Sequence, residues 1–263
     1  MRRLLPLLAV AALAAGCGHG TRSSSPPLGK TSSTVATTTA PSTSTAITTQ
    51  GQVVVRVYFL RDGKVAPVAR TVPGPAVAAR ALEQLRAGPT AAEQAEGFTS
   101  AAQAAPTVLL LEDGVATVEV GNTSHAGLAQ IVYTLTQFPT VHGVRTSRML
   151  GDAKPLTRAN FEDVTPAILI ERPLPGDTVT SPLPVSGTAN TFEATFDLEL
   201  RNSSGVRVAW RFVTASSGSG TRGTYDTTIS FPHTGGPITL VAYEPSAENG
   251  QPLHVVRIPL RER

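Results

Sequence analysis

The stretch that decides the fold is a β-hairpin, VVVRVYFLRDGKVAPVARTV, at Val53–Val72. Its first half is rich in β-branched and aromatic residues, which favour strands. Asp62-Gly63 lies between the two apolar runs, and this dipeptide is typical of a two-residue turn between antiparallel strands. Folded sequence is therefore predicted to begin at Val53.

Two helices are predicted further along the chain. The first follows Pro75, which suits a first helical turn, and ends at Gly88, because apolar residues between them recur at helical spacing. The second begins at Ser124, a residue type that favours helix N-caps, and ends before Pro139. Residues 141–149 then have the composition of a strand.

A second hairpin is predicted around Asp113-Gly114, with strands at residues 107–112 and 115–120. A two-residue turn places Leu111 opposite Ala116 and Leu109 opposite Val118 on one face. Residues 53–164 are thus predicted to form an α+β domain with a mixed sheet and two helices on one face.

Residues 167–263 have a different pattern, with about seven short alternating strands that are typical of an all-β sandwich. We expect Phe192 and Phe196 on the inner face of one strand. An odd-length loop then pairs Phe196 with Trp210 in the core and leaves Glu199 opposite Arg207 outside. On this reasoning Trp210→Ala costs about 3–5 kcal/mol.

The N-terminus has the features of a secretory signal, with Arg2 and Arg3 followed by an apolar run at residues 4–15. As a helix this run spans about 18 Å, well short of the ~30 Å hydrocarbon core. Ala14-Ala15-Gly16-Cys17 resembles the bacterial lipobox. The resemblance implies removal of a signal peptide, residues 1–16, lipidation of Cys17 with fatty acids such as palmitate, and an anchor on the extracytoplasmic face of the cell membrane. The alternative is a secreted protein with an incidental cysteine.

Residues 17–52 are rich in Ser, Thr, Pro and Ala and are predicted to form a disordered tether, because they have no apolar face to bury. Charge excludes a nucleic-acid partner: 22 basic residues exceed 19 acidic ones by only three, and two of the basic residues lie in the predicted signal. A single cysteine excludes disulfides within the chain.

The sequence shows no constellation that points to catalysis, a cofactor or a metal. The histidines lie apart, with no spacing typical of zinc ligands, at His125, His142, His233 and His254. Ser203-Ser204-Gly205 and residues 217–223 are predicted to be turns. Glu112 and Asp113 flank a hairpin turn, and Glu193, Asp197 and Glu199 are expected on a solvated strand face paired with Arg207 and Arg211. A partner-binding role for that face is the alternative.

Five motifs in residues 53–164 resemble the GerMN domain of sporulation and spore germination. They are YFL (58–60), VAPVAR (65–70), LRAGPT (85–90), DGVATV (113–118) and AQIVYTLT (129–136). Residues 167–263 resemble the immunoglobulin-like domain that accompanies GerMN domains, through IERPLPG (170–176), SPLPVSGTA (181–189) and FEA (192–194).

The resemblance implies a non-enzymatic, lipid-anchored envelope protein that acts in protein–protein assembly or cell-wall association. The expected partner is an envelope protein or the cell wall, contacted through an exposed sheet edge or loop of the GerMN-like domain, and an oligomer is left open. If the charges of Arg56, Arg61 and Lys64 prevent strand addition at this edge, the immunoglobulin-like domain makes the contact instead. Two other classes remain: a sensor lipoprotein bound to a membrane signalling partner, and an enzyme acting on peptidoglycan.

Overall fold

The computed structural model describes residues 51–102, 106–149 and 153–263. The chain divides into two units, Met1–Ile47 and Thr48–Arg263, and every described residue belongs to the second. The predicted signal peptide, Cys17 and all but the last two residues of the predicted tether lie outside the described residues.

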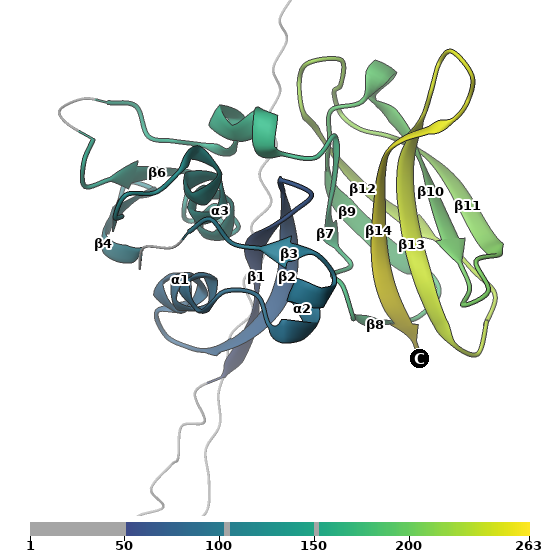
Figure 1. Cartoon of the computed structure of the whole chain (residues 1–263), viewed down its shortest axis with the longest axis horizontal. Helices are drawn as coiled ribbons and strands as arrows, with labels where there is room; N and C mark the ends of the chain where they lie inside the picture. The colour runs from purple at the N-terminus through teal and green to yellow at the C-terminus, as the bar shows by residue number, and fades with distance from the viewer. Residues whose placement is uncertain (1–50, 103–105, 150–152) are drawn as a thin grey trace, which may run out of the picture. The chain divides into compact units, whose positions relative to one another are not determined.

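The first hairpin forms as predicted. Strand β1 (Gln52–Arg61) pairs antiparallel with β2 (Lys64–Pro73), with Leu60 opposite Val65. Asp62 and Gly63 both have positive φ, 52° and 73°, which is the geometry that a type I′ turn requires. The short strand β3 (Phe98–Thr99) pairs with the end of β1 and completes a three-stranded sheet, β2-β1-β3 (Figure 1).

Both predicted helices are present. Helix α1 (Val77–Ala87) buries Leu82 and Leu85 and ends at Gly88, whose φ of 81° is accessible to glycine at no steric cost. It begins two residues after Pro75, which therefore precedes the helix rather than lying in its first turn.

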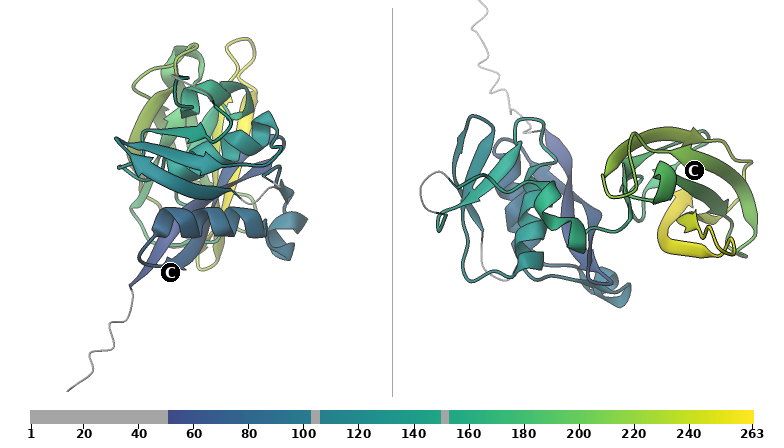
Figure 2. Two further views of the ribbon diagram at one scale, coloured as in Figure 1. Left: turned by 90° about the vertical axis from the view of Figure 1, so that its left-hand side faces the viewer. Right: turned by 90° about the horizontal axis from the view of Figure 1, so that it is seen from above.

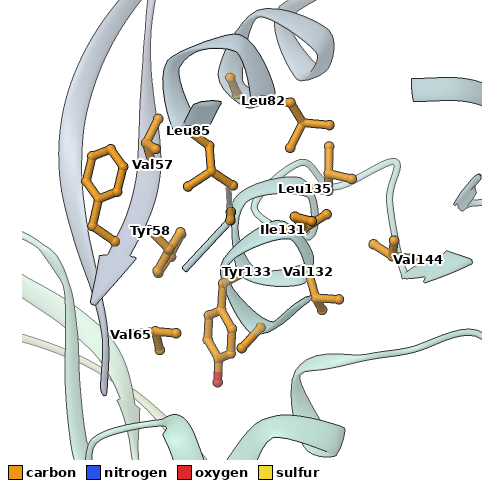
Figure 3. Close-up of a cluster of buried hydrophobic side chains, with 14 of the residues drawn as sticks. Val57, Tyr58, Val65, Leu82, Leu85, Ile131, Val132, Tyr133, Leu135 and Val144 are labelled. Atoms are coloured by element: carbon orange, nitrogen blue, oxygen red, sulfur yellow. The ribbon is translucent and has the colours of Figure 1, made fainter. Parts of the chain in front are cut away.

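Helix α3 (His125–Leu135) is capped by Ser124, whose hydroxyl accepts a hydrogen bond from Gly127 N at 3.2 Å. Figure 3 shows side chains of α1, α3 and β1, among them Leu85, Ile131 and Val57, converging on one core. The capping box of Thr90 and Glu93 starts a further short helix, α2 (Ala91–Ala95), which the periodicity did not predict.

The second hairpin also forms, and it lies in a separate mixed sheet. Strand β4 (Thr107–Glu112) pairs antiparallel with β5 (Val115–Glu119), and β6 (Gly143–Thr146) pairs parallel with β5. The strands of this α+β region are thus shared between two three-stranded sheets.

The predicted register of this hairpin is correct only near the turn. Leu111 lies opposite Ala116 as expected, but Val108 rather than Leu109 lies opposite Val118. The register shifts between Val108 and Leu110, so Leu109 is the extra residue of a β-bulge.

The C-terminal part is β-rich, as predicted. Its strands are β7 (Ile168–Arg172), β8 (Thr178–Val179), β9 (Leu183–Ala189), β10 (Thr195–Arg201), β11 (Arg207–Thr214), β12 (Gly223–Ile229), β13 (Pro237–Pro245) and β14 (Pro252–Glu262). They form a five-stranded sheet, β11-β10-β13-β14-β8, and a three-stranded sheet, β12-β9-β7 (Figure 2). Phe196 of the first sheet meets Tyr225 of the second at 4.8 Å between ring centroids, so the two sheets share one core.

The expected core position of Trp210 is wrong. Trp210 is 52% exposed and lies opposite Glu199, while Phe196 pairs with Val213. The loop after β10 puts Arg201, rather than the expected Glu199, opposite Arg207, and the register then shifts, because Leu200 pairs with Ala209. The extra residue in β11 is Val208, and a one-residue shift turns every following side chain to the other face.

Phe192 was also expected in the core and is 60% exposed. It precedes β10 in the short 3-10 helix η2 (Phe192–Ala194) rather than continuing the strand, so the strand alternation does not reach it.

Candidate functional site

The residues considered for catalysis are dispersed. Nε2 of His125 lies 2.9 Å from Asp163 Oδ1, and Nδ1 of His233 lies 2.8 Å from Glu262 Oε1. Both imidazoles are exposed, and the two pairs lie on different elements. His254 lies 3.8 Å from Glu244. His142 lies beside the β4–β5 turn, where its backbone N donates to Gly114 O at 2.7 Å. Within the described residues, no three His, Cys, Asp or Glu side chains gather closely enough to hold a metal ion.

The Ser- and Gly-rich segments form turns. Asn202 Oδ1 accepts hydrogen bonds from Ser204 N and Val206 N, which closes the β10–β11 loop. Gly220 N donates to Asn190 Oδ1 at 2.9 Å in the loop before β12. Asp113 has a φ of 47° in the β4–β5 turn, beside Glu112 at the end of β4.

A partly buried charged cluster connects β1, the 3-10 helix η1 (Arg158–Val164) and β7. Arg158 donates to Glu171 Oε1 and to Thr136 Oγ1, each at 2.9 Å, and its guanidinium lies 4.6 Å from the ring centroid of Tyr133. The Tyr58 hydroxyl also donates to Glu171. Burial opposes ionisation of Glu171, but the charge of Arg158 and the Tyr58 hydrogen bond outweigh it and lower its pKa. These groups satisfy one another, so the cluster is structural.

The most exposed apolar strand of the α+β region is β4. It pairs on one side only, with β5, so its other edge offers unpaired backbone groups among the described strands. Leu109, Leu110 and Leu111 are each about half exposed, at 53%, 53% and 48%. We call this surface, residues 109–111 with the free edge of β4, the leucine edge.

The leucines of the leucine edge lie on both sides of the sheet. Leu111 pairs with the buried Ala116 and so shares the inner face, whereas Leu110 pairs with Thr117 on the opposite face. Three consecutive exposed apolar residues on an edge strand are uncommon, because such an edge can recruit another strand.

The basic residues expected to guard a sheet edge do not lie on β4, although Lys64 begins β2, an edge strand of the β2-β1-β3 sheet. Arg56 is in the central strand β1, where its backbone N donates to Gln137 Oε1 at 2.7 Å. Lys64 Nζ donates to Asp163 O at 2.6 Å, and Arg61 donates to Arg257 O at 3.4 Å. None of them belongs to β4, which contains no Lys, Arg or Pro.

A second exposed group lies on β10, β11 and β13 in the β-rich region. Glu199 was expected on a solvated face directly opposite Arg207, and both expectations are wrong: it is 2% exposed and lies opposite Trp210. Its carboxylate accepts hydrogen bonds from Arg201, Arg207 and the Tyr243 hydroxyl, so it contacts Arg207 through the side chains alone. Burial opposes ionisation of Glu199, but these three donors outweigh it and lower its pKa. Burial and Glu199 together raise the pKa of Tyr243 to about 12. The exposure of Trp210 and Phe212 beside this network could not be read from strand alternation, because it depends on the bulge at Val208.

Comparisons with known proteins agree with this architecture. Residues 56–147 match the Germane family, described as sporulation and spore germination, and residues 167–251 match Gmad2, the immunoglobulin-like domain of bacterial spore germination. The chain thus carries both domain types in the order predicted.

A solved structure, the tandem GerMN domains of the sporulation protein GerM from Bacillus subtilis, is similar with a TM-score of 0.35 and 15% identity. The similarity covers 68% of this chain and 62% of that chain, less than two thirds of its length. A search of curated proteins finds no match. Over the described ranges, no helix has the length and apolar character needed to cross a membrane.

Proposed function

We propose that this chain is a non-enzymatic, lipid-anchored protein of the bacterial cell envelope that acts in protein–protein assembly during sporulation or germination. The matches of residues 56–147 to the Germane family and of residues 167–251 to the Gmad2 family support the process. The signal-like N-terminus and the lipobox-like motif ending at Cys17 support the anchor and the extracytoplasmic location.

The leucine edge carries the proposal for assembly. A partner that presents an extended apolar segment adds a strand beside β4, and main-chain hydrogen bonds then supply affinity. Leu110 lies on one face of the sheet and Leu111 on the other, so side chains on both faces of the added strand cover them. Apolar burial contributes roughly 25 cal/mol per Å² of surface removed from water.

The edge is regular where the partner would bind. The bulge at Leu109 interrupts the ladder at the N-terminal half of β4, and Leu110, Leu111 and Glu112 continue in regular pairing with β5. Glu112 ends the strand and favours a partner segment with a basic residue at its matching end.

The test is site-specific photocrosslinking in cells. A crosslinkable residue at Leu110 should capture an envelope protein, whereas the same residue at Leu253, an exposed leucine of β14 in the β-rich region, should not. Leu110→Lys should remove the adduct formed from a crosslinker at Leu111, because a lysine on an edge strand opposes strand addition.

The Lys variant is expected to remain folded, since substitutions at exposed positions usually change stability by about 0.5 kcal/mol or less. Adducts from Leu253 but none from β4, or adducts unaffected by Leu110→Lys in a folded protein, would show that assembly does not use the leucine edge.

A further inference from the structure

The outer face of the five-stranded sheet in the β-rich region carries three aromatic rings around two carboxylates. In the register of β10 and β11, Glu199 lies opposite Trp210 and Asp197 lies opposite Phe212. On the other side of β10, Asp197 lies opposite Tyr243 of β13. Residues directly opposite on one face are about 5 Å apart at Cβ. We call this surface the aromatic face and define it by Asp197, Glu199, Trp210, Phe212 and Tyr243.

Trp210 and Phe212 project from this face into solvent. They are 52% and 53% exposed, and they occupy alternate positions of one strand, about 7 Å apart along it. The bulge at Val208 turns them outward: continuing the register of Arg201 with Arg207 would place Trp210 opposite the buried Leu198 and Phe212 opposite the buried Phe196. Bulges commonly re-aim side chains next to binding sites.

The charges on the aromatic face are balanced. Glu199 is held by Arg201 and Arg207, with closest contacts of 2.5 and 3.1 Å, and by the Tyr243 hydroxyl at 3.0 Å. Asp197 lies opposite Tyr243, and its Oδ1 is buried, with less than 1 Å² exposed, so this atom is not available to a ligand. The face therefore combines exposed rings with little net charge.

We propose that the aromatic face binds a neutral polysaccharide chain. Sugar rings stack on Trp210 and Phe212 through their C–H faces. Aromatic rings present an electron-rich surface to such C–H groups. Arg201 and Arg207 are engaged with Glu199, so they neither require an acidic ligand nor leave an unbalanced negative site for a cation.

The area of the aromatic face disfavours a protein partner. The exposed halves of Trp210 and Phe212 amount to about 200 Å², given about 150–250 Å² for each ring system. A stable protein interface needs about 800 Å² from each partner. Strand addition at β11 is also hindered, because its ladder is interrupted at Val208 and its exposed side chains include Arg207 and Arg211.

This site lies on different residues from the leucine edge, and its test does not depend on the proposed function. The purified full chain is titrated with chitohexaose and with cellohexaose, two neutral β-linked oligosaccharides. Trp210 is the single tryptophan, so its fluorescence reports directly on the face. We expect a saturable shift in emission with one or both probes, and the probe that binds shows whether acetamido groups are required.

Variants then locate the binding by calorimetry. Trp210→Ala and Phe212→Ala should each weaken binding by about tenfold or more, which corresponds to about 1.4 kcal/mol. Trp210→Phe keeps a ring and should bind nearly as well as the wild type. Leu253→Ala is the matched control, because Leu253 is 45% exposed and lies in β14, outside the aromatic face. Circular dichroism checks that each variant is folded, and Phe212→Ala and Trp210→Phe suffice if Trp210→Ala unfolds.

Salt distinguishes a neutral glycan from a charged ligand. Binding should be unchanged when ionic strength rises from about 0.05 to about 0.5 M, because only charged pairs are screened. The proposal is overturned if neither oligosaccharide binds at millimolar concentration, or if Trp210→Ala binds as well as the control. It is also overturned if the face binds hexalysine in a salt-dependent manner instead, or if light scattering shows a dimer that Trp210→Ala dissociates.

Discussion

Replacing Arg158 by methionine tests whether the partly buried charged cluster of Arg158, Glu171 and Tyr58 stabilises the fold. Methionine keeps the apolar stem but removes the guanidinium, which leaves Glu171 with the Tyr58 hydroxyl as its remaining hydrogen-bond donor in the cluster. Removing one partner of a buried ion pair costs about 3–5 kcal/mol. The Arg158 and Glu171 side chains are 24% and 15% exposed, so we expect the lower end, about 3 kcal/mol.

A double-mutant cycle separates the pair from other effects of the substitutions. Arg158→Met, Glu171→Gln and the double variant are unfolded in urea and followed by circular dichroism. The double variant should lose at least about 1 kcal/mol less unfolding free energy than the sum of the losses in the two single variants, because the second substitution removes a charge that the first has left unpaired. Arg80–Glu83 on α1 is the matched exposed pair, and Arg80→Met should cost about 0.5 kcal/mol or less.

The same pair predicts an acid dependence of stability. The pKa of Glu171 is lower in the folded chain than its ordinary value of about 4.3, so its contribution is complete above that pH and is lost as pH falls through the folded value. Glu171→Gln should remove this part of the acid dependence. Strictly additive costs in the cycle, together with an unchanged acid profile in Glu171→Gln, would refute the reasoning.

Three further predictions follow from individual positions. Trp210 should be quenched by acrylamide in the folded chain, with an emission maximum that shifts little on unfolding, and a strongly blue-shifted native spectrum would place it in the core after all. Gly187→Ala should lower stability by at least about 2 kcal/mol, because its Cβ would lie 2.0 Å from Leu169 O and 2.9 Å from the Tyr225 hydroxyl; a thermal midpoint equal to that of the wild type contradicts this. Cys17→Ser should abolish fatty-acid labelling and membrane attachment without changing the fold, and a Ser variant that still takes up label shows that the anchor lies elsewhere.

Local signals predicted most of the elements. The Asp-Gly pairs at residues 62–63 and 113–114 tolerate positive φ, so both hairpins could be placed from the sequence. Ser124 and Gly88 marked a helix start and a helix end for the same kind of local reason. Helix α2 was missed, although its capping box, Thr90 with Glu93 three residues later, is a sequence signal.

The sites were harder to predict than the elements. A sheet edge of the α+β region was expected to bind a partner, but only strand order shows that β4 is an edge, and only burial shows that Leu110 and its neighbours are exposed. The charged cluster could not be predicted, because Tyr58, Arg158 and Glu171 are far apart in the chain and meet only after packing.

The sequence alone determined whatever depends on a few neighbouring residues: turns that need positive φ, helix ends, and the change from an α+β to a β-rich pattern near residue 167. Tertiary structure decided which face each strand turns to the core. One extra residue at Val208 reverses the orientation of Trp210 and Phe212, and one at Leu109 shifts the register of β4. The position of a bulge depends on packing against strands distant in sequence, and because side chains alternate with a period of two, a single-residue shift exchanges core and surface.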